Sequence, residues 1–163
     1  VIPKKRRKIF FVLAGLLFIF YCGRTIMRNY QWQEPLKFYE HELKYSSNSF
    51  LLHNNLGVEL FRKGEMGKAG KEFEAAVKIC PHYANSHNNL GVVMENNGML
   101  DTAISEYQAA IALNDYVLAY SNLGRLYLKT HEREKAIEVL EKGKRLYPLD
   151  SDINRYLNLA YLQ

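Results

Sequence analysis

The chain has 163 residues, a length normal for one folded domain with its own core. Residues 1–29 hold seven of its 22 basic residues and no acidic one, which leaves 15 basic and 17 acidic residues in residues 30–163. The net charge of +5 thus belongs to the N-terminal segment, and the composition argues against a nucleic-acid-binding domain, which would carry a basic stripe on its folded part.

An uncharged apolar run follows a basic cluster at the N-terminus. Lys4 to Lys8 are all basic, and the next fifteen residues, Ile9 to Gly23, carry no charge. A membrane-spanning helix needs roughly 20 apolar residues. Extending the run to Met27, with Arg24 reaching outward, brings it close to that length. We therefore predict a transmembrane helix over residues 9–27, preceded by a basic flank at residues 1–8.

Two alternatives to a membrane anchor are a cleaved signal peptide and a buried helix of a soluble domain. The bulky end of the run, Phe18 to Cys22, disfavours cleavage, which needs small residues before the cut. The excess of basic residues before the run places residues 1–8 in the cytoplasm. The rest of the chain is then expected on the non-cytoplasmic side, in a periplasm or lumen.

An internal repeat is the strongest pattern in the sequence. A His-Asn-Asn-Leu-Gly-Val motif beginning at His53 recurs 34 residues later at His87. Related motifs begin at Tyr120, 33 residues further on, and more weakly at Asn154, 34 residues after that. Such a period indicates stacked helix pairs.

The positions within each unit have physical reasons. The motif glycines Gly57, Gly91 and Gly124 allow a second helix to approach the first closely. Gly64 and Gly98 stand where the first helix must end in a left-handed residue, and His131 takes that place in the third unit. We expect the following helix of each unit to begin its contact face with an alanine.

The period and residue types resemble the tetratricopeptide repeat (TPR) from Phe50 onward. The resemblance implies an all-α fold: a right-handed α-solenoid whose first helices line a concave, protein-binding groove. The expected parts are a transmembrane helix (9–27), a junction with a capping helix (28–49), three repeats (50–83, 84–116 and 117–150) and a partial fourth repeat (151–163). In this last part Leu157, Ala160 and Tyr161 are expected to have no second helix to pack on.

The predicted groove is rich in amides and apolar side chains. A carboxamide both donates and accepts, which suits the backbone of an extended peptide. Asn55, Asn89 and Asn122 occupy equivalent places and resemble the asparagine ladder of the O-GlcNAc transferase family. The alternative is that these asparagines bond only to neighbouring parts of the fold. The full set of candidate binding residues is Asn54, Asn55, Asn88, Asn89, Asn122, Val58, Val92, Phe61, Arg125 and Leu128.

No catalytic constellation is recognisable, so we do not expect this chain to be an enzyme by itself. The five histidines are scattered and suggest no metal site, and no cofactor motif is found. We expect a scaffold that binds other proteins or extended peptides.

The junction Arg28-Asn29-Tyr30-Gln31-Trp32 resembles that of polytopic transmembrane-and-TPR proteins, which include O-mannosyltransferase-like enzymes. The chain opens with Val and stops in mid-repeat, as expected of a fragment of a longer protein. The resemblance implies an alternative function as the substrate-recruiting C-terminal arm of a membrane glycosyltransferase. A third possibility is a tether or assembly factor for a membrane complex.

Overall fold

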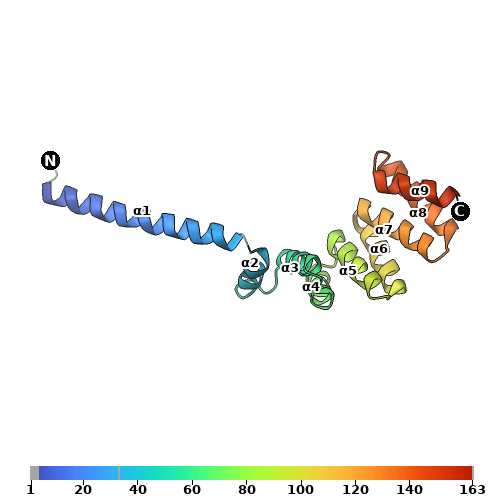
Figure 1. Cartoon of the computed structure of the whole chain (residues 1–163), viewed down its shortest axis with the longest axis horizontal. Coiled ribbons are helices and arrows are strands. Elements are labelled where there is room, and N and C mark those ends of the chain that lie inside the picture. The colour runs from blue at the N-terminus through green and yellow to red at the C-terminus, as the bar shows by residue number, and fades with distance from the viewer. Residues whose placement is uncertain (1–3, 33, 163) are drawn as a thin grey trace.

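The described part of the chain is all α-helical. The computed structural model describes residues 4–32 and 34–162, with side chains for residues 13–27 and 34–162, and contains no strand in these ranges (Figure 1). The helices are α1 (Lys4–Trp32), α2 (Pro35–Leu43), α3 (Phe50–Arg62), α4 (Met66–Ile79), α5 (Ala84–Asn96), α6 (Leu100–Asn114), α7 (Val117–Lys129), α8 (Arg133–Leu146) and α9 (Ser151–Leu162).

Helices α3 to α8 form three stacked pairs. Helices α3 and α4, α5 and α6, and α7 and α8 pack on each other, and the second helix of each pair packs on the first helix of the next. Helix α2 covers α3 at one end of the stack, and α9 packs on α7 and α8 at the other (Figure 1). The prediction of an all-α repeat solenoid is therefore confirmed.

The turn inside each helix pair follows the predicted left-handed residue. Gly64 and Gly98 have φ angles of +79° and +77°, and His131 takes the same region at 61°. In each turn the next residue donates its backbone N–H to a carbonyl five residues earlier, as from Glu65 to Leu60 at 2.9 Å. This bond satisfies a carbonyl that the end of the helix would leave unpaired.

The motif glycines bring the two helices of a pair into close contact. A Cβ atom at Gly91 would lie 2.7 Å from Cε1 of Tyr107 and 3.3 Å from the backbone oxygen of Ala103. Tyr107 and Ala103 are fully buried, so neither has space to move away. Equivalent contacts would arise at Gly57 with Phe73 and at Gly124 with Leu140.

Helix α1 extends away from the repeats and includes the segment predicted to span a membrane (Figure 1). Among the described residues, no helix is long and apolar enough to cross a membrane. The side chains of residues 9–12 lie outside the described part, as do those of the junction at 28–32. Large apolar side chains are nevertheless exposed along the described part of α1: Leu13, Leu16, Leu17, Phe18, Ile19, Phe20, Tyr21, Ile26 and Met27.

The last helix is better packed than the sequence suggests. Leu157 and Ala160 were expected to lack a partner helix, but both are buried, because α9 lies against α7 and α8 of the preceding pair. Tyr161 is half exposed, and its hydroxyl donates a 2.6 Å hydrogen bond to Glu141. Burying the inner face of α9 therefore requires only the preceding repeat.

Candidate functional site

A mostly apolar cavity opens between the first and second repeats. Its volume is about 290 Å³, enough for one or two side chains of a ligand. Its walls come from α3, α4 and α5. The lining residues are Val58, Phe61, Arg62, Phe73, Asn89 and Val92. Four of the ten predicted binding residues therefore lie around one cavity: Val58, Phe61, Asn89 and Val92.

Two lining residues, Arg62 and Phe73, are not among the ten predicted binding residues, and the buried one of the two is Phe73. It lies on α4, where the repeat pattern accounts for an aromatic residue by packing between units. The ring approaches α3 at Gly57, where a Cβ atom would lie only 2.6 Å from its Cε1 atom. Phe73 is 2% exposed, so it forms the floor of the cavity and stays part of the core.

The side chain of Asn54 is buried and forms hydrogen bonds inside the fold. It is 4% exposed, and its Oδ1 atom accepts hydrogen bonds from Ser86 Oγ and from Asn89 Nδ2, both at 3.1 Å. Asn89 Nδ2 also donates to Asn85 Oδ1 at 2.7 Å. Both N–H bonds of the Asn89 amide are thus used inside the fold, while its carbonyl oxygen accepts no bond from the described residues.

The same link recurs one repeat further on. Asn122 Nδ2 donates to Oδ1 of Asn88 at 3.0 Å, and Asn88 is 3% exposed. Leu128 is also buried, within the core. Asn54, Asn88 and Leu128 are therefore buried in this structure and offer a ligand little surface. Asn55 is only half-buried, and its Oδ1 atom receives a long 3.5 Å contact from Asn54 Nδ2.

Arg125 is engaged in an ion pair between the second and third repeats. Its Nη1 and Nη2 atoms donate to Oε1 and Oε2 of Glu95 at 2.7 and 2.8 Å. The hydroxyl of Tyr107 donates to the same carboxylate at 3.1 Å, and Lys129 Nζ lies 3.6 Å from it. A planar, two-bond contact of this kind fixes the relative position of the two helices that carry it.

The charges in this cluster compensate each other. Burial acts to raise the pKa of Glu95, but the hydrogen bonds and positive charge of Arg125 outweigh it and hold that pKa below its ordinary value. Burial, reinforced by the charge of Glu95, raises the pKa of Tyr107 well above its usual range. Glu95 is therefore a carboxylate, Tyr107 is a neutral donor, and two N–H groups of Arg125 are held in the ion pair.

Two histidines have a role that the sequence did not reveal. His53 Nδ1 lies 2.6 Å from Glu72 Oε2, and its Nε2 lies 3.0 Å from the backbone oxygen of Ser47. His87 repeats this arrangement with Glu106 at 2.7 Å and the backbone oxygen of Pro81 at 2.9 Å. The recurring signal in the sequence is a glutamate nineteen residues after each histidine.

Comparisons with known proteins agree with the repeat architecture. A family model described as TPR repeat matches residues 57–98, and one described as tetratricopeptide repeat matches residues 117–148. None of the curated proteins compared matches the sequence. The residues matched by the family models do not reach the junction at 28–32, so the resemblance of that segment to O-mannosyltransferase-like proteins stays a prediction.

Several solved structures have the same fold. A crystal structure of MamA is 29% identical, covers 77% of this chain and 74% of its own, and superposes with a TM-score of 0.70. TTC0263, a thermophilic TPR protein of Thermus thermophilus, is 24% identical over 78% of this chain and 72% of its own, with a TM-score of 0.68. The first TPR of Spaghetti (RPAP3), bound to the HSP90 peptide SRMEEVD, is 21% identical over 69% of this chain and 90% of its own, with a TM-score of 0.65. The two family models thus identify tetratricopeptide repeats in residues 57–98 and 117–148 of this chain, and the solved structures show the same fold.

Proposed function

We propose that this protein binds an extended segment of another protein across the cavity between its first and second repeats. The observation that carries the proposal is that Val58, Phe61 and Val92 line one apolar cavity beside the carboxamide of Asn89. An apolar pocket with a few oriented polar groups is the usual form of a binding site. Burial of an apolar side chain would supply affinity, and the carboxamide would orient the backbone.

The hydrogen bonds of Asn89 within the fold determine which backbone group of a peptide it can bind. Because both of its N–H bonds are donated to Asn54 and Asn85, only its carbonyl oxygen is left for a ligand. Asn89 would therefore accept a backbone N–H from the bound peptide rather than donate to a carbonyl. Asn122, which donates to Asn88, keeps an N–H and a carbonyl oxygen for the next part of the peptide.

The family supports a binding role for the repeats in general. One protein of the same fold, the first TPR of Spaghetti, is bound to a peptide of HSP90. At 21% identity this likeness concerns the fold alone. The chemistry of the ligand is therefore argued from the cavity of this chain: an extended backbone with one apolar side chain, such as Leu or Phe, at the cavity.

A Val92→Trp variant of the full chain tests the proposal, because the indole would fill the cavity. Peptides would first be selected on the wild-type chain from a random display library and then measured by fluorescence anisotropy. We expect Val92→Trp to weaken the selected peptides at least about tenfold, equivalent to about 1.4 kcal/mol. Ser105→Trp, at an exposed position on α6, is the control. Unchanged affinity in a folded Val92→Trp protein would refute the proposal.

Membrane attachment through α1 is a second part of the proposal. It is motivated by the exposed apolar side chains along the described part of this helix, among them Leu16 and Phe20. Attachment with residues 1–8 in the cytoplasm would present the groove on the non-cytoplasmic side.

Fractionation of cells followed by carbonate extraction tests this part separately. The wild-type chain should stay with the membranes, and a Leu16→Arg, Phe20→Arg variant should be extracted, because charges inside an apolar span are costly. Release of the wild-type chain by carbonate would contradict the anchor and leave the groove proposal unaffected.

A further inference from the structure

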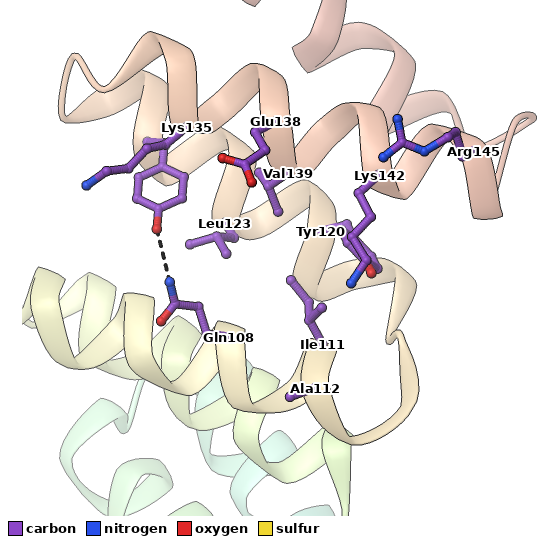
Figure 2. A pocket seen from close by; sticks show the side chains of 11 residues that line it. Gln108, Ile111, Ala112, Tyr120, Leu123, Lys135, Glu138, Val139, Lys142 and Arg145 are labelled. Atoms are coloured by element: carbon purple, nitrogen blue, oxygen red, sulfur yellow. Dashed lines mark hydrogen bonds between the residues drawn. The ribbon is translucent and has the colours of Figure 1, made fainter.

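A second cavity lies on the other side of the stack, between α6 and α8. We call it the α6–α8 groove; its volume is about 570 Å³, and Figure 2 shows its lining side chains. From α7 it receives Tyr120, Leu123 and Tyr127. With 3.6 residues per turn, these three point away from the face of α7 that carries Asn122 and Arg125. The groove is therefore separate from the proposed peptide site.

The floor of the α6–α8 groove is apolar. Ile111 of α6, Leu123 of α7 and Val139 of α8 point into it, and the ring of Tyr120 closes one end (Figure 2). At the other end Gln108 donates a 3.2 Å hydrogen bond to the hydroxyl of Tyr127. Such a floor suits an aliphatic or aromatic side chain of a ligand.

The rim on α8 is basic. Lys135, Lys142 and Arg145 line the groove with a single acidic residue, Glu138. Lys142 and Arg145 are three residues apart and therefore neighbours on one helix face, about 5–6 Å apart between Cβ atoms. Arg145 has no ion-pair partner among the described residues.

The remaining rim cations have only weak internal partners. Lys142 Nζ lies 3.7 Å from Asp115, and its side chain is 54% exposed. Lys135 pairs with Glu132, three residues earlier on the surface. Exposed ion pairs of this kind contribute little free energy, so both ammonium groups can turn to a ligand.

The first two repeats show that this groove is a local departure from the repeat pattern. In the second repeat the positions of Tyr120 and Val139 are taken by His87 and Glu106, which bond to each other. In the third repeat the polar pair is replaced by Tyr and Val, and the Tyr120 hydroxyl turns away to Asp115 at 2.6 Å.

The basic rim is shared only in part with the earlier repeats. The residues equivalent to its three basic residues are Thr102, Ala109 and Ala112 in the second repeat and Lys68, Ala75 and Lys78 in the first. An apolar floor and a basic rim therefore arise together at one repeat junction, in a region of the chain with more acidic than basic residues.

We propose that the α6–α8 groove binds an acidic peptide segment in which an aliphatic or aromatic residue is adjacent to two or more carboxylates. The apolar side chain lies on the floor formed by Ile111, Leu123 and Val139. The carboxylates accept charge-assisted hydrogen bonds from Lys142 and Arg145, at the end of the groove away from Lys135. This second site does not depend on the cavity between the first two repeats.

The test uses the full chain and a fluorescein-labelled peptide with a Leu-Phe pair beside a short run of glutamates. We expect Lys142→Glu to weaken its binding about tenfold or more, as for the loss of one charge-assisted contact. Lys144→Glu is the matched control: the same charge change on the same helix, at a position that does not line the groove. It should change affinity less than about twofold.

Two further measurements separate the apolar contribution from charge. Ala112→Trp, at an exposed position in the groove wall, should block binding without changing any charge. A probe in which glutamines replace the glutamates should bind the wild-type chain at least about tenfold more weakly. Equal losses in Lys142→Glu and Lys144→Glu would show attraction by overall charge and overturn the proposal, as would unchanged binding in Lys142→Glu or in folded Ala112→Trp.

Discussion

Arg125 and Glu95 join the second and third repeats by two parallel hydrogen bonds of 2.7 and 2.8 Å. The carboxylate side chain is 6% exposed and the guanidinium side chain 34% exposed. Glu95 lies on α5 and Arg125 on α7, the first helices of adjacent repeats. The pair therefore sets how one repeat stacks on the next, beyond what apolar packing alone specifies.

Removing Arg125 should destabilise the protein, because the carboxylate of Glu95 would stay buried without its main partner. Breaking a fully buried pair costs about 3–5 kcal/mol. Since a third of the Arg125 side chain is exposed, we expect about 2 kcal/mol for Arg125→Met, measured by urea unfolding. Adding Glu95→Gln, which can still accept from Tyr107, should restore about half of the loss. A double variant no more stable than Arg125→Met would contradict this account.

The pair should also make stability depend on pH in a defined direction. In the wild type the pKa of Glu95 is held below its ordinary value of 4.5, so the stabilisation it brings is complete above that value. It is lost as pH falls through the lowered pKa of the folded state.

In Arg125→Met burial dominates and raises the pKa of Glu95, so protonation relieves the penalty as the solution is acidified. The difference in unfolding free energy between the two proteins should therefore shrink from neutral pH towards about pH 4. Urea midpoints measured across this range check it, and a constant difference would argue against the assigned role of Glu95.

Gly91→Ala should be strongly destabilising although alanine favours helix. The new Cβ would overlap the ring of Tyr107, which cannot move because it is buried and bonded to Glu95. Overpacking of this kind costs about 1–3 kcal/mol. Gly67→Ala is the control, since its Cβ would meet nothing within 4 Å and should stabilise the chain by about 0.5–1 kcal/mol. Thermal melts showing equal effects at both sites would contradict the close approach of α5 and α6.

Replacing the buried Asn54 should destabilise the protein far more than replacing the half-buried Asn55. Asn54→Ala leaves the buried hydroxyl of Ser86 and the amide of Asn89 without their acceptor and should cost about 2 kcal/mol. Asn55→Ala removes only a 3.5 Å contact and should change stability by less than about 0.5 kcal/mol. Chemical denaturation of the two variants gives the comparison, and similar losses would mean that Asn55 is structural as well.

The repeat architecture could be predicted from the sequence because it depends on short-range backbone and packing rules. Two such constraints recur with the repeat period. One is a residue with left-handed backbone angles, at Gly64 and Gly98, and the other is the absence of a Cβ atom, at Gly91. The sequence even allowed His131 to be placed in a left-handed turn, against the usual preference for glycine.

The binding residues were harder to predict. Helical spacing shows on which face of a helix a residue lies but not how deeply its side chain is buried. Asn54 and Asn55 are adjacent in the sequence, yet one is buried between repeats and the other is half-buried. The pairing of Arg125 with Glu95 joins residues 30 positions apart, and the α6–α8 groove depends on two simultaneous replacements, at Tyr120 and Val139. These relationships follow from the stacking of particular side chains.

Site-specific photocrosslinking shows directly whether a bound peptide lies at the cavity between the first two repeats. The photoreactive residue p-benzoylphenylalanine would be placed at Arg62, whose side chain is 70% exposed at the edge of the cavity between the first two repeats, and at Ser105 on the exposed side of α6. We expect the selected peptides that Val92→Trp weakens to crosslink at the Arg62 position and not at the Ser105 position. Crosslinking at Ser105 alone would contradict a binding site between the first and second repeats.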